Sequence, residues 1–413
     1  MHLRTTDIDI SSVEFWSKTF DERENVFARL RAEAPVSWHD PLETPGLPPS
    51  EHGEAGFWAV TKAADIRHVS RHPEVYSSEL GQVSLRPVPY RLRPNLLVMD
   101  PPQHTRHRKI ISSAFTPASL ARLEAQIAAR AARIVDEIAG GGELDFVKAV
   151  SGKLPLSTVA DLIGVPPSEH ERFVVAGDAF VGSELPDLPD GVDIEAFFAE
   201  QVAYLRALFL DLAAVRRRKP VEDLMSYVVQ AEIDGRRLTD EEVISPMLLL
   251  VVAGDDTTKQ TTTLTQLALA RHPDQREWLA GDFDARIGSA VEEFVRFASP
   301  IVVFARTARS DTVLRGVEIA AGDKVGLFYC SGNRDEEVFP APHRFDLSRP
   351  TGQHVAFGGG GAHHCLGAGV ARLQLRHLFE QLLRKVPVIE VGEPEYVVSE
   401  FVHGIRRLPV RIP

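Results

Sequence analysis

Apolar side chains recur every three to four residues through most of the middle and the end of the chain, which is the spacing of amphipathic helices. This spacing predicts helices over residues 118–139, 205–218, 239–270, 291–297 and 365–383. The longest of them has Thr239 as a candidate N-cap and three acidic residues in its first turn, where the helix dipole favours negative charge. Pro246 predicts an early kink in the same helix, because proline has no amide hydrogen to donate.

Extended segments and loops account for the rest of the pattern. Short extended segments are predicted for residues 56–61, 83–85, 301–307, 312–314 and 324–327. Residues 40–56 and 182–191 are rich in proline and glycine, and residues 86–102 contain five prolines, so all three stretches predict loops. We therefore expect a protein that is mainly α with a small β-rich region.

The composition narrows the class of protein. The chain has 413 residues, of which 44% are hydrophobic and 25% charged, so it can bury enough surface to enclose a cofactor. Its net charge of −12 argues against nucleic acid as a partner, because phosphate binding requires a basic surface. Two cysteines, Cys330 and Cys365, form no disulfide framework and fit a reducing compartment.

Membrane insertion is not expected either. The N-terminus has no apolar stretch typical of a signal peptide. The longest apolar run, Met247–Ala253, is far shorter than the roughly 20 residues that span a bilayer. The sequence therefore predicts a cytoplasmic protein without stable membrane insertion.

The strongest chemical signal is the string FGGGGAHHCLG at residues 357–367. Glycines let a loop pass close to a flat ligand, and this loop delivers Cys365 to the start of the last predicted helix. Unpaired N–H groups at a helix N-terminus stabilise a thiolate, and a thiolate can bind haem iron. A buried structural cysteine is the plain alternative. A phosphate-binding loop would need Lys and Ser or Thr after the glycines, and a zinc site would need more cysteines than Cys330.

A second motif, AGDDTT at residues 253–258, lies in the middle of the longest predicted helix. Gly254 weakens such a helix by about 1 kcal/mol relative to alanine. Asp256 and Thr257 are polar where the preceding apolar run predicts burial, and a buried acid is costly unless it is paired or functional. A widened helical turn would hold dioxygen and water beside Thr257. An ordinary kink with threonine–backbone hydrogen bonds is the alternative.

Two further groups of charged residues have the spacing of one helical face. His104 and Arg108, four residues apart in the string DPPQHTRHR, are cationic donors that suit an anionic ligand, with a solvated basic patch as the alternative. Glu293 and Arg296 are three residues apart, and by themselves they are typical of a solvated pair. Arg349, in the string FDLSR, is a candidate partner for that pair.

The glycine-rich string resembles the haem-binding loop of the cytochrome P-450 superfamily, whose usual form is F-G-x-G-x-H-x-C-x-G. The match runs through Gly361, His363, Cys365 and Gly367, and one extra residue separates Phe357 from Cys365. The four-glycine version resembles actinobacterial members that oxidise sterols, methyl-branched lipids and terpenoids. The other motifs follow in the family's order, and the resemblance covers roughly residues 15–410.

This resemblance implies a single cytochrome P-450 catalytic domain over residues 1–413, with the haem-thiolate fold and haem b (iron protoporphyrin IX) as cofactor. Cys365 would bind the iron, and the haem propionates would be bound by His104, Arg108, Arg306 and His363. The hydroxyl of Thr257 would stabilise the activated oxygen, and protons would arrive through Asp256. Glu293, Arg296 and Arg349 would form a buried structural network.

The implied reaction is the insertion of one oxygen atom from O2 into an unactivated C–H bond of a hydrophobic small molecule, such as a sterol, branched lipid, terpenoid or polyketide. The implied substrate pocket is formed by Leu249, Val252, Ala253, Val303, Phe304 and Phe401. A peroxide-driven hydroxylase and a non-catalytic haem protein that binds ligands are the alternatives. Thr257 argues against the first, and the Asp256–Thr257 pair argues against the second.

The resemblance also implies ferredoxin and ferredoxin reductase as electron donors. A ferredoxin is usually acidic, so an acidic protein needs a local basic surface to receive it. Two cationic clusters are candidates for such a surface: Arg106, His107 and Lys109 beside the expected propionate ligands, and Arg372, Arg376 and His377 after Cys365.

Overall fold

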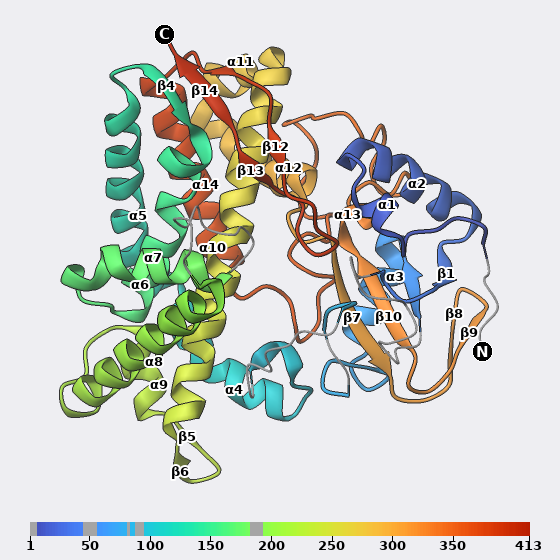
Figure 1. Cartoon of the computed structure of the whole chain (residues 1–413), viewed down its shortest axis with the longest axis horizontal. Helices are drawn as coiled ribbons and strands as arrows, with labels where there is room; N and C mark the ends of the chain where they lie inside the picture. Colours follow the sequence, from blue (N-terminus) through green and yellow to red (C-terminus); the bar gives the residue numbers. More distant parts are fainter. Residues whose placement is uncertain (1–5, 44–55, 81–82, 87–94, 182–192) are drawn as a thin grey trace.

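A body of packed helices and a smaller β-rich part lie side by side in the molecule (Figure 1). The computed structural model describes residues 6–43, 56–80, 83–86, 95–181 and 193–413. The mainly α fold with a small β-rich region, expected from the periodicity, is confirmed.

Helices make up most of the described chain. They are α1 (Val13–Trp16), α2 (Phe20–Glu33), α3 (Ala63–Arg71), α4 (Gln103–Ser112), α5 (Pro117–Ile138), α6 (Lys153–Ile163), α7 (His170–Val181), α8 (Ile194–Arg218), α9 (Leu224–Gln230), α10 (Asp240–Arg271), α11 (Pro273–Gly281), α12 (Phe283–Ala298), α13 (Tyr329–Gly332) and α14 (Ala368–Lys385).

The strands are short and form several small sheets. They are β1 (Val36–His39), β2 (Phe57–Val60), β3 (Tyr76–Ser77), β4 (Gly142–Asp145), β5 (Glu232–Ile233), β6 (Arg236–Arg237), β7 (Val303–Ala308), β8 (Thr312–Leu314), β9 (Val317–Ile319), β10 (Lys324–Phe328), β11 (Glu390–Val391), β12 (Glu395–Tyr396), β13 (Ile405–Arg407) and β14 (Pro409–Ile412). The largest sheet has the order β1-β2-β10-β7-β3, and only its β2–β10 pair is parallel.

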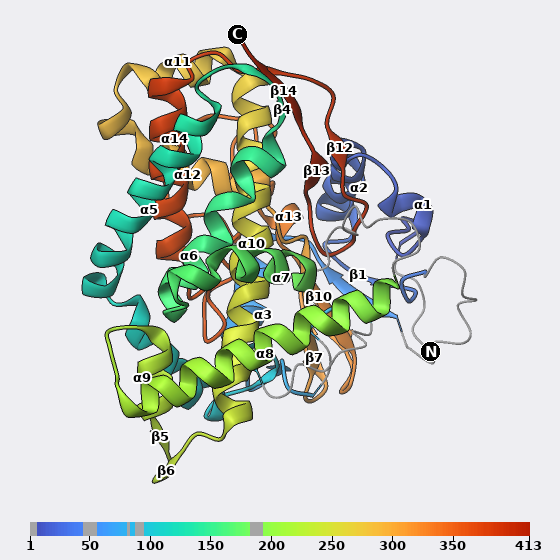
Figure 2. The ribbon, with the colours of Figure 1, turned by 60° about the vertical axis from the view of Figure 1, so that its left-hand side comes forward.

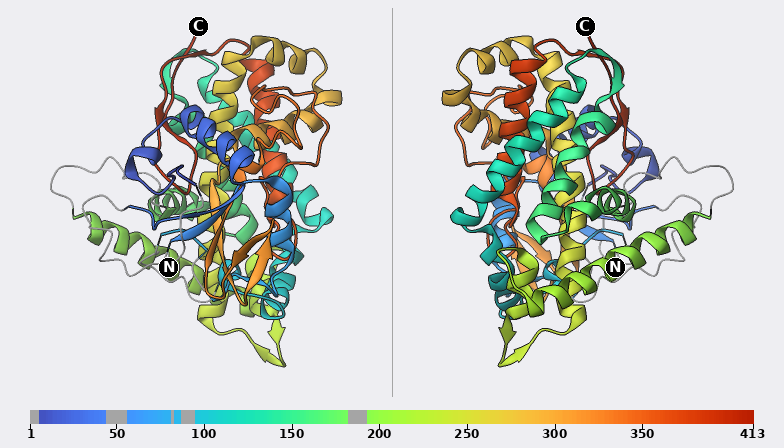
Figure 3. Two further views of the ribbon diagram at one scale, coloured as in Figure 1. Left: turned by 90° about the vertical axis from the view of Figure 1, so that its right-hand side faces the viewer. Right: turned by 90° about the vertical axis from the view of Figure 1, so that its left-hand side faces the viewer.

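Helix α10 is the central element of the helical body. The Thr239 side chain accepts from the Glu242 N–H while the Glu242 side chain accepts from the Thr239 N–H, so the predicted N-cap is confirmed as a reciprocal capping box. One apolar cluster joins α10 to α5, α12 and α14, and another joins it to α6, α7, α8 and α9. Figure 2 shows α8 crossing α10 on one side, and Figure 3 shows the sheet side and the helical side of the molecule. Because α10 is buried on most faces, its few polar side chains require a local explanation.

Several predicted boundaries differ from the structure. Residues 83–86 form bends, although residues 83–85 were expected to be extended; the Val83 carbonyl accepts from the Ala305 N–H at 2.8 Å. Helix α12 begins at Phe283, eight residues before the predicted start, because Asp282 caps it by accepting from the Ala285 N–H. Helix α14 begins three residues after Cys365. The predicted loop 182–191, residues 44–55 of the loop 40–56 and residues 87–94 of the loop 86–102 lie outside the described residues.

Candidate active site

A cavity of about 650 Å³ lies between α10, β7, α4 and the loop that precedes α14. Its wall brings together nearly all the site residues predicted from the sequence: His104, Arg108, Leu249, Val252, Ala253, Asp256, Thr257, Phe304, Arg306, His363, Cys365 and Phe401. These residues come from segments up to about three hundred positions apart. The cavity is therefore the candidate active site.

Val303 is the exception, and its prediction as a pocket residue is wrong. Val303 is 1% exposed and packs into the apolar cluster under the sheet, beside Phe328 and Ala305. Side chains alternate between the two faces of a strand, so Val303 and Phe304 cannot both face the cavity. Phe304 lines it, and Ile301 joins it from the residues before the strand.

The glycine-rich loop is shaped by helix α3 as well as by the cavity. A Cβ at Gly359 would lie 2.5 Å from Ser70 Oγ, and a Cβ at Gly361 would lie 2.4 Å from the Ser70 carbonyl oxygen. Gly358, Gly360 and Gly361 also have positive φ, at 93°, 92° and 72°. The glycine run is thus required by close contact with the end of α3 and by left-handed backbone.

Cys365 closes this loop. Its N–H donates to the Phe357 carbonyl at 2.9 Å, so the extra residue of the loop is contained in a closed turn. The Phe357 ring is held from outside by Arg372, whose guanidinium carbon lies 4.5 Å from the ring centre. The extra residue therefore leaves Phe357 packed against the loop and lining the cavity.

The sulfur of Cys365 has the surroundings of a thiolate ligand. It is open to the cavity, yet the dense protein around it raises the pKa of the thiol through burial. The N–H groups of Gly367 and Ala368, at the start of α14, and the charges of Arg108 and Arg372 act in the opposite direction on this pKa. The stabilisation of a thiolate by the N–H groups of a helix N-terminus, which was expected from the sequence, thus comes from the residues two and three positions after the cysteine.

Four basic side chains converge on one part of the cavity wall. The ring centres of His104 and His363 lie 4.3 Å apart. Burial is the largest cause that lowers the pKa of His104 to about 4, and the positive charge of Arg108 is the second. For His363, burial is again the largest cause and the charge of Arg306 the second, and the pKa falls to about 3. The buried Nδ1 of His104 has no hydrogen-bond partner among the described residues.

These basic groups have the properties of an anion cradle. The nearby carboxylate of Asp100 is already bonded to the Ser78 N–H at 2.9 Å and to Arg309 at 2.5 Å. The positive charge of the cradle therefore comes from Arg108 and Arg306, while the two histidines, which are neutral near pH 7 because their pKa values are lowered, supply ring nitrogens for hydrogen bonds; this combination fits the two propionates of haem b.

The Asp256–Thr257 pair lies in a regular stretch of α10. The helix is continuous through it, so the expected widened turn is absent from this described segment, and the Thr257 hydroxyl donates to the Ala253 carbonyl at 3.0 Å. Gly254 is required by packing, because a Cβ there would lie 2.6 Å from Val159 Cγ2. Asp256 is 4% exposed and accepts from Gln260 Nε2 at 3.1 Å.

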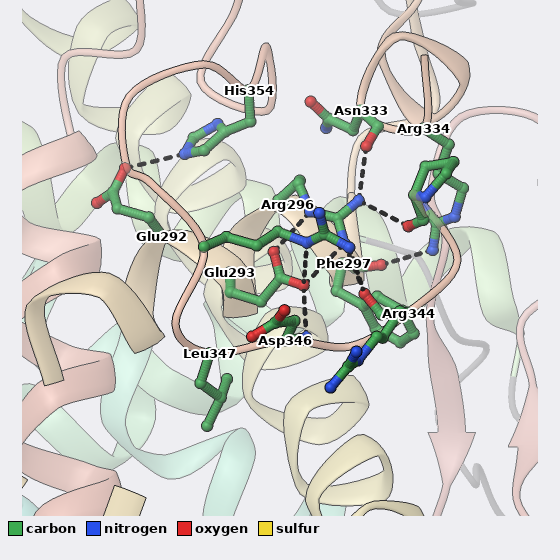
Figure 4. A network of polar contacts seen from close by, with 12 residues as sticks. Glu292, Glu293, Arg296, Phe297, Asn333, Arg334, Arg344, Asp346, Leu347 and His354 are labelled. Carbon is green, nitrogen blue, oxygen red and sulfur yellow. Dashed lines mark hydrogen bonds and ion pairs between the residues drawn. The ribbon is translucent and has the colours of Figure 1, made fainter. Parts of the chain in front are cut away.

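A buried ion-pair network supports the segment that leads to the cysteine loop (Figure 4). Arg296 donates to both carboxylate oxygens of Glu293, at 2.6 and 2.8 Å, and Arg349 Nε lies 3.3 Å from Glu293 Oε1. Arg296 also donates to the Asn333 carbonyl at 2.8 Å, and the Asn333 side chain accepts from the Val355 N–H at 2.7 Å. The predicted network of Glu293, Arg296 and Arg349 is confirmed, and it reaches the residue two positions before Phe357.

Two kinds of site residue were not predicted from the sequence. Val397, Val398 and Ser399 line the cavity from the C-terminal loop, and no periodicity or motif marks them. Lys259 and Gln260 contact Asp256 from three and four positions along α10, a spacing that is a detectable signal.

A mainly α fold around a cavity with one open cysteine and a cationic cradle is the architecture of a haem-thiolate protein. The chain matches the family model Cytochrome P-450 over residues 195–395. The methyl-branched lipid omega-hydroxylase of Mycobacterium tuberculosis is 42% identical to it in an alignment of length 411 that covers 98% of this chain and 94% of that protein. The steroid C26-monooxygenase of Mycolicibacterium smegmatis is 38% identical in an alignment of length 392 that covers 93% of this chain and 89% of that protein.

A solved structure is similar over the same extent. The cytochrome P-450 of Mycobacterium marinum in complex with pseudoionone has 47% sequence identity and a TM-score of 0.91, with 98% of each chain covered. The chain therefore belongs to the cytochrome P-450 family. It is a monooxygenase of a family that binds haem b, and its relatives hydroxylate hydrophobic molecules. In the part of the chain that the structure describes, no helix is long and apolar enough to cross a membrane.

Proposed function

We propose that this monooxygenase inserts one oxygen atom of O2 into an unactivated C–H bond of a hydrophobic lipid, sterol or terpenoid. The observation that carries this proposal is the composition of the cavity wall beside Asp256 and Thr257. That wall is supplied by apolar side chains: Val83, Leu97, Leu249, Val252, Ala253, Ile301, Phe304, Val397, Phe401 and Val402. Such a surface favours an apolar substrate and excludes water from the reacting centre. The names of the relatives, a methyl-branched lipid hydroxylase and a steroid monooxygenase, support the same class of substrate.

The proposed roles follow from the positions of the side chains. Cys365 would bind the haem iron, and His104, Arg108, Arg306 and His363 would bind the propionates, with His104 Nδ1 available as a donor or acceptor. Haem b, when bound, supplies the redox-active iron at which O2 is activated. The Thr257 hydroxyl, which donates a hydrogen bond to the Ala253 carbonyl, would be the hydrogen-bond donor for O2 in the cavity, and the Asp256 carboxylate would hold the proton that is passed toward Thr257.

The substrate class is tested by a binding screen. The purified haem-loaded protein is titrated with a methyl-branched fatty acid, a sterol, a terpenoid ketone and a macrolide, and binding is measured from the shift of the Soret band. We expect the first three to bind and to give a hydroxylated product with O2 and a reductant. Binding of the macrolide alone would contradict the proposal.

Electron supply separates the main proposal from the peroxide-driven alternative. We propose ferredoxin and ferredoxin reductase as donors, and the cytoplasmic location expected from the sequence stays a prediction. Turnover with NADH, reductase and ferredoxin is compared with turnover on hydrogen peroxide alone. Faster product formation with peroxide than with the complete electron-transfer chain would favour the alternative.

Replacing Thr257 with alanine tests the proposed hydroxyl donor. We expect NADH and O2 consumption to continue while product per NADH falls by about tenfold, because the reacting oxygen loses a positioned donor. Thr257→Ser is the matched control, since it keeps a hydroxyl at the same position and should retain most of the product yield. Peroxide released and product formed are measured together, and an unchanged ratio in Thr257→Ala would remove this role.

Fewer basic side chains are left to bind a ferredoxin than the sequence suggested. Arg106 is paired with Asp234 at 2.8 Å, Arg372 with Glu292 at 2.5 Å, and His377 with Glu124 at 2.9 Å. Lys109 and Arg376 are exposed, and neither has an ion-pair partner among the described residues. Arg108, next to Lys109, donates to the His364 carbonyl at 2.6 Å, so α4 and α14 both flank the cysteine loop.

Reversing the charges of Lys109 and Arg376 should slow electron transfer to the haem. We expect Lys109→Glu and Arg376→Glu each to lower the rate of ferredoxin-driven haem reduction, and we expect added salt to slow the unmodified protein, because exposed charges are screened over about 10 Å at 0.1 M. Lys18→Glu, in the short segment between α1 and α2, is the control for net charge; Lys18 pairs with Glu14, and both helices belong to the β-rich part of the molecule (Figure 1). Stopped-flow reduction rates that are indifferent to both reversals would exclude this surface.

A further inference from the structure

Lys259 is a buried lysine on α10, three residues after Asp256. Its side chain is 5% exposed, and its ammonium lies 3.2 Å from Asp178 Oδ1, 3.5 Å from Asp256 Oδ1 and 3.8 Å from Asp255 Oδ2. Asp255 and Asp256 are also buried, at 0% and 4% exposed. Burying a charged lysine costs desolvation free energy, so a charged lysine at this position requires strong partners or a function.

The packing of three helices places the ammonium among these carboxylates. Asp178 belongs to α7, and the residue before it, Gly177, packs so closely that a Cβ there would lie 2.8 Å from Leu156 of α6 and 3.2 Å from Val251 of α10. Gly254 packs against α6 in the same way. The two glycines bring α7 and α10 together over α6, and Lys259 bridges them by its bond to Asp178.

Asp256 is thereby held by one of its two oxygens. Oδ1 accepts from Gln260 Nε2 at 3.1 Å and lies 3.5 Å from the Lys259 ammonium. Gln260 is itself fixed, because its Oε1 accepts from the Ile405 N–H at 2.8 Å. Oδ2 has no hydrogen-bond partner in the described protein, and Asp256 lines the cavity. The carboxylate is therefore oriented by Oδ1, with Oδ2 left for a group that is not part of the chain.

We propose that Lys259 is a positioning residue for the reaction: it fixes the orientation and charge of Asp256, and its bond to Asp178 anchors this arrangement to α7. The proposal rests on the proposed role of Asp256 in proton delivery. Lys259 acts through Asp256, and the two residues form one functional unit with Gln260. A purely structural lysine would stabilise the helices without altering how oxygen consumption is coupled to product.

The test compares single and double variants in the haem-loaded protein. Product per NADH is measured for Lys259→Met, Asp256→Asn and the double variant Lys259→Met/Asp256→Asn. We expect each single variant to lose about tenfold in this ratio, and the double variant to be no worse than Asp256→Asn alone, because a residue that acts through another adds nothing once that other is removed. Lys259→Arg keeps the positive charge and should recover most of the ratio.

Two further measurements separate positioning from folding. Lys259→Met leaves two buried carboxylates without this cation, so the melting temperature is recorded, and Lys259→Met/Asp255→Asn, which has one buried charge fewer, is tested if the single variant is unstable. Hydrogen peroxide already carries the protons that O2 must receive, so peroxide-driven product formation by Lys259→Met should stay within about twofold of the unmodified protein if only proton delivery is impaired. Asp178→Asn should give a smaller loss of product per NADH than Lys259→Met, because Asp178 is 63% exposed.

The outcomes distinguish this inference from the function on which it rests. If Asp256→Asn leaves product per NADH unchanged, the proposed role of Asp256 fails and the role of Lys259 fails with it. If Asp256→Asn lowers the ratio while the folded Lys259 variants match the unmodified protein, only the Lys259 proposal is overturned. Equal losses in the NADH-driven and peroxide-driven reactions of Lys259→Met would also overturn it, since they would indicate a general defect of the site.

Discussion

Replacing Cys365 with serine will abolish the thiolate-type Soret band that carbon monoxide gives with the reduced haem protein, and monooxygenase turnover will be lost with it. The cysteine is open to the cavity, faces the N–H groups of Gly367 and Ala368, and lies near two arginines. A serine hydroxyl is a much weaker acid than a thiol and supplies no soft anionic ligand to the iron. The measurement is the difference spectrum of the reduced protein with and without carbon monoxide.

Cys330→Ala is the control for this experiment. Cys330 is 1% exposed in the apolar cluster under the sheet, and burial raises the pKa of its thiol to about 12. It is therefore a neutral structural side chain, and its removal should leave the band in place. A thiolate-type band that persists in Cys365→Ser would show that the ligand had been assigned to the wrong residue.

Arg296→Met will have the largest effect on stability. Arg296 is 2% exposed, and its loss leaves the equally buried carboxylate of Glu293 without its main partner (Figure 4). Breaking one side of a buried pair costs about 3–5 kcal/mol, which is a large share of the roughly 5–15 kcal/mol that stabilises a folded protein. We expect the free energy of unfolding, measured by chemical denaturation, to fall by about this amount, together with weaker retention of haem, because the same network reaches Val355.

Two variants test whether the loss of stability in Arg296→Met is caused by leaving a buried charge without its partner. Glu293→Leu/Arg296→Met removes both charges and should be less destabilising than the sum of the single changes. Arg29→Met removes an exposed partner of Glu33 on α2 and should cost no more than about 1 kcal/mol. An Arg296→Met protein as stable as Arg29→Met would contradict the structural role of the network.

The local part of the site could be predicted because its signals lie close together in the chain. The cysteine loop is a continuous string, and the capping box at Thr239 and Glu242 depends on residues three positions apart. His104 and Arg108 share a helical face, and the Glu293–Arg296 pair lies within one turn of α12. For each of these features, short-range geometry alone determines which groups meet.

Contacts between distant segments could not be predicted in the same way. Three of the six side chains expected to form a docking surface are paired with acids from other elements: Arg106 with Asp234, Arg372 with Glu292 and His377 with Glu124. No pattern in the sequence marks Val397, Val398 and Ser399 of the C-terminal loop as cavity residues, and the place of this loop beside β7 depends on a backbone hydrogen bond from the Val302 N–H to the Phe401 carbonyl. Such pairings depend on how the elements pack.

The sequence by itself determined the family, the candidate iron ligand and the mainly α fold, because these follow from motif spacing and helical periodicity. The tertiary structure alone decided that Val303 faces the core while Phe304 faces the cavity, since strand alternation has no reference side until the sheet is packed. It also decided that Lys259 bridges Asp178 and Asp256, because two glycines allow α7 and α10 to approach over α6. The partners of a long flexible side chain depend on which helices pack around it, and that packing depends on contacts across the whole fold.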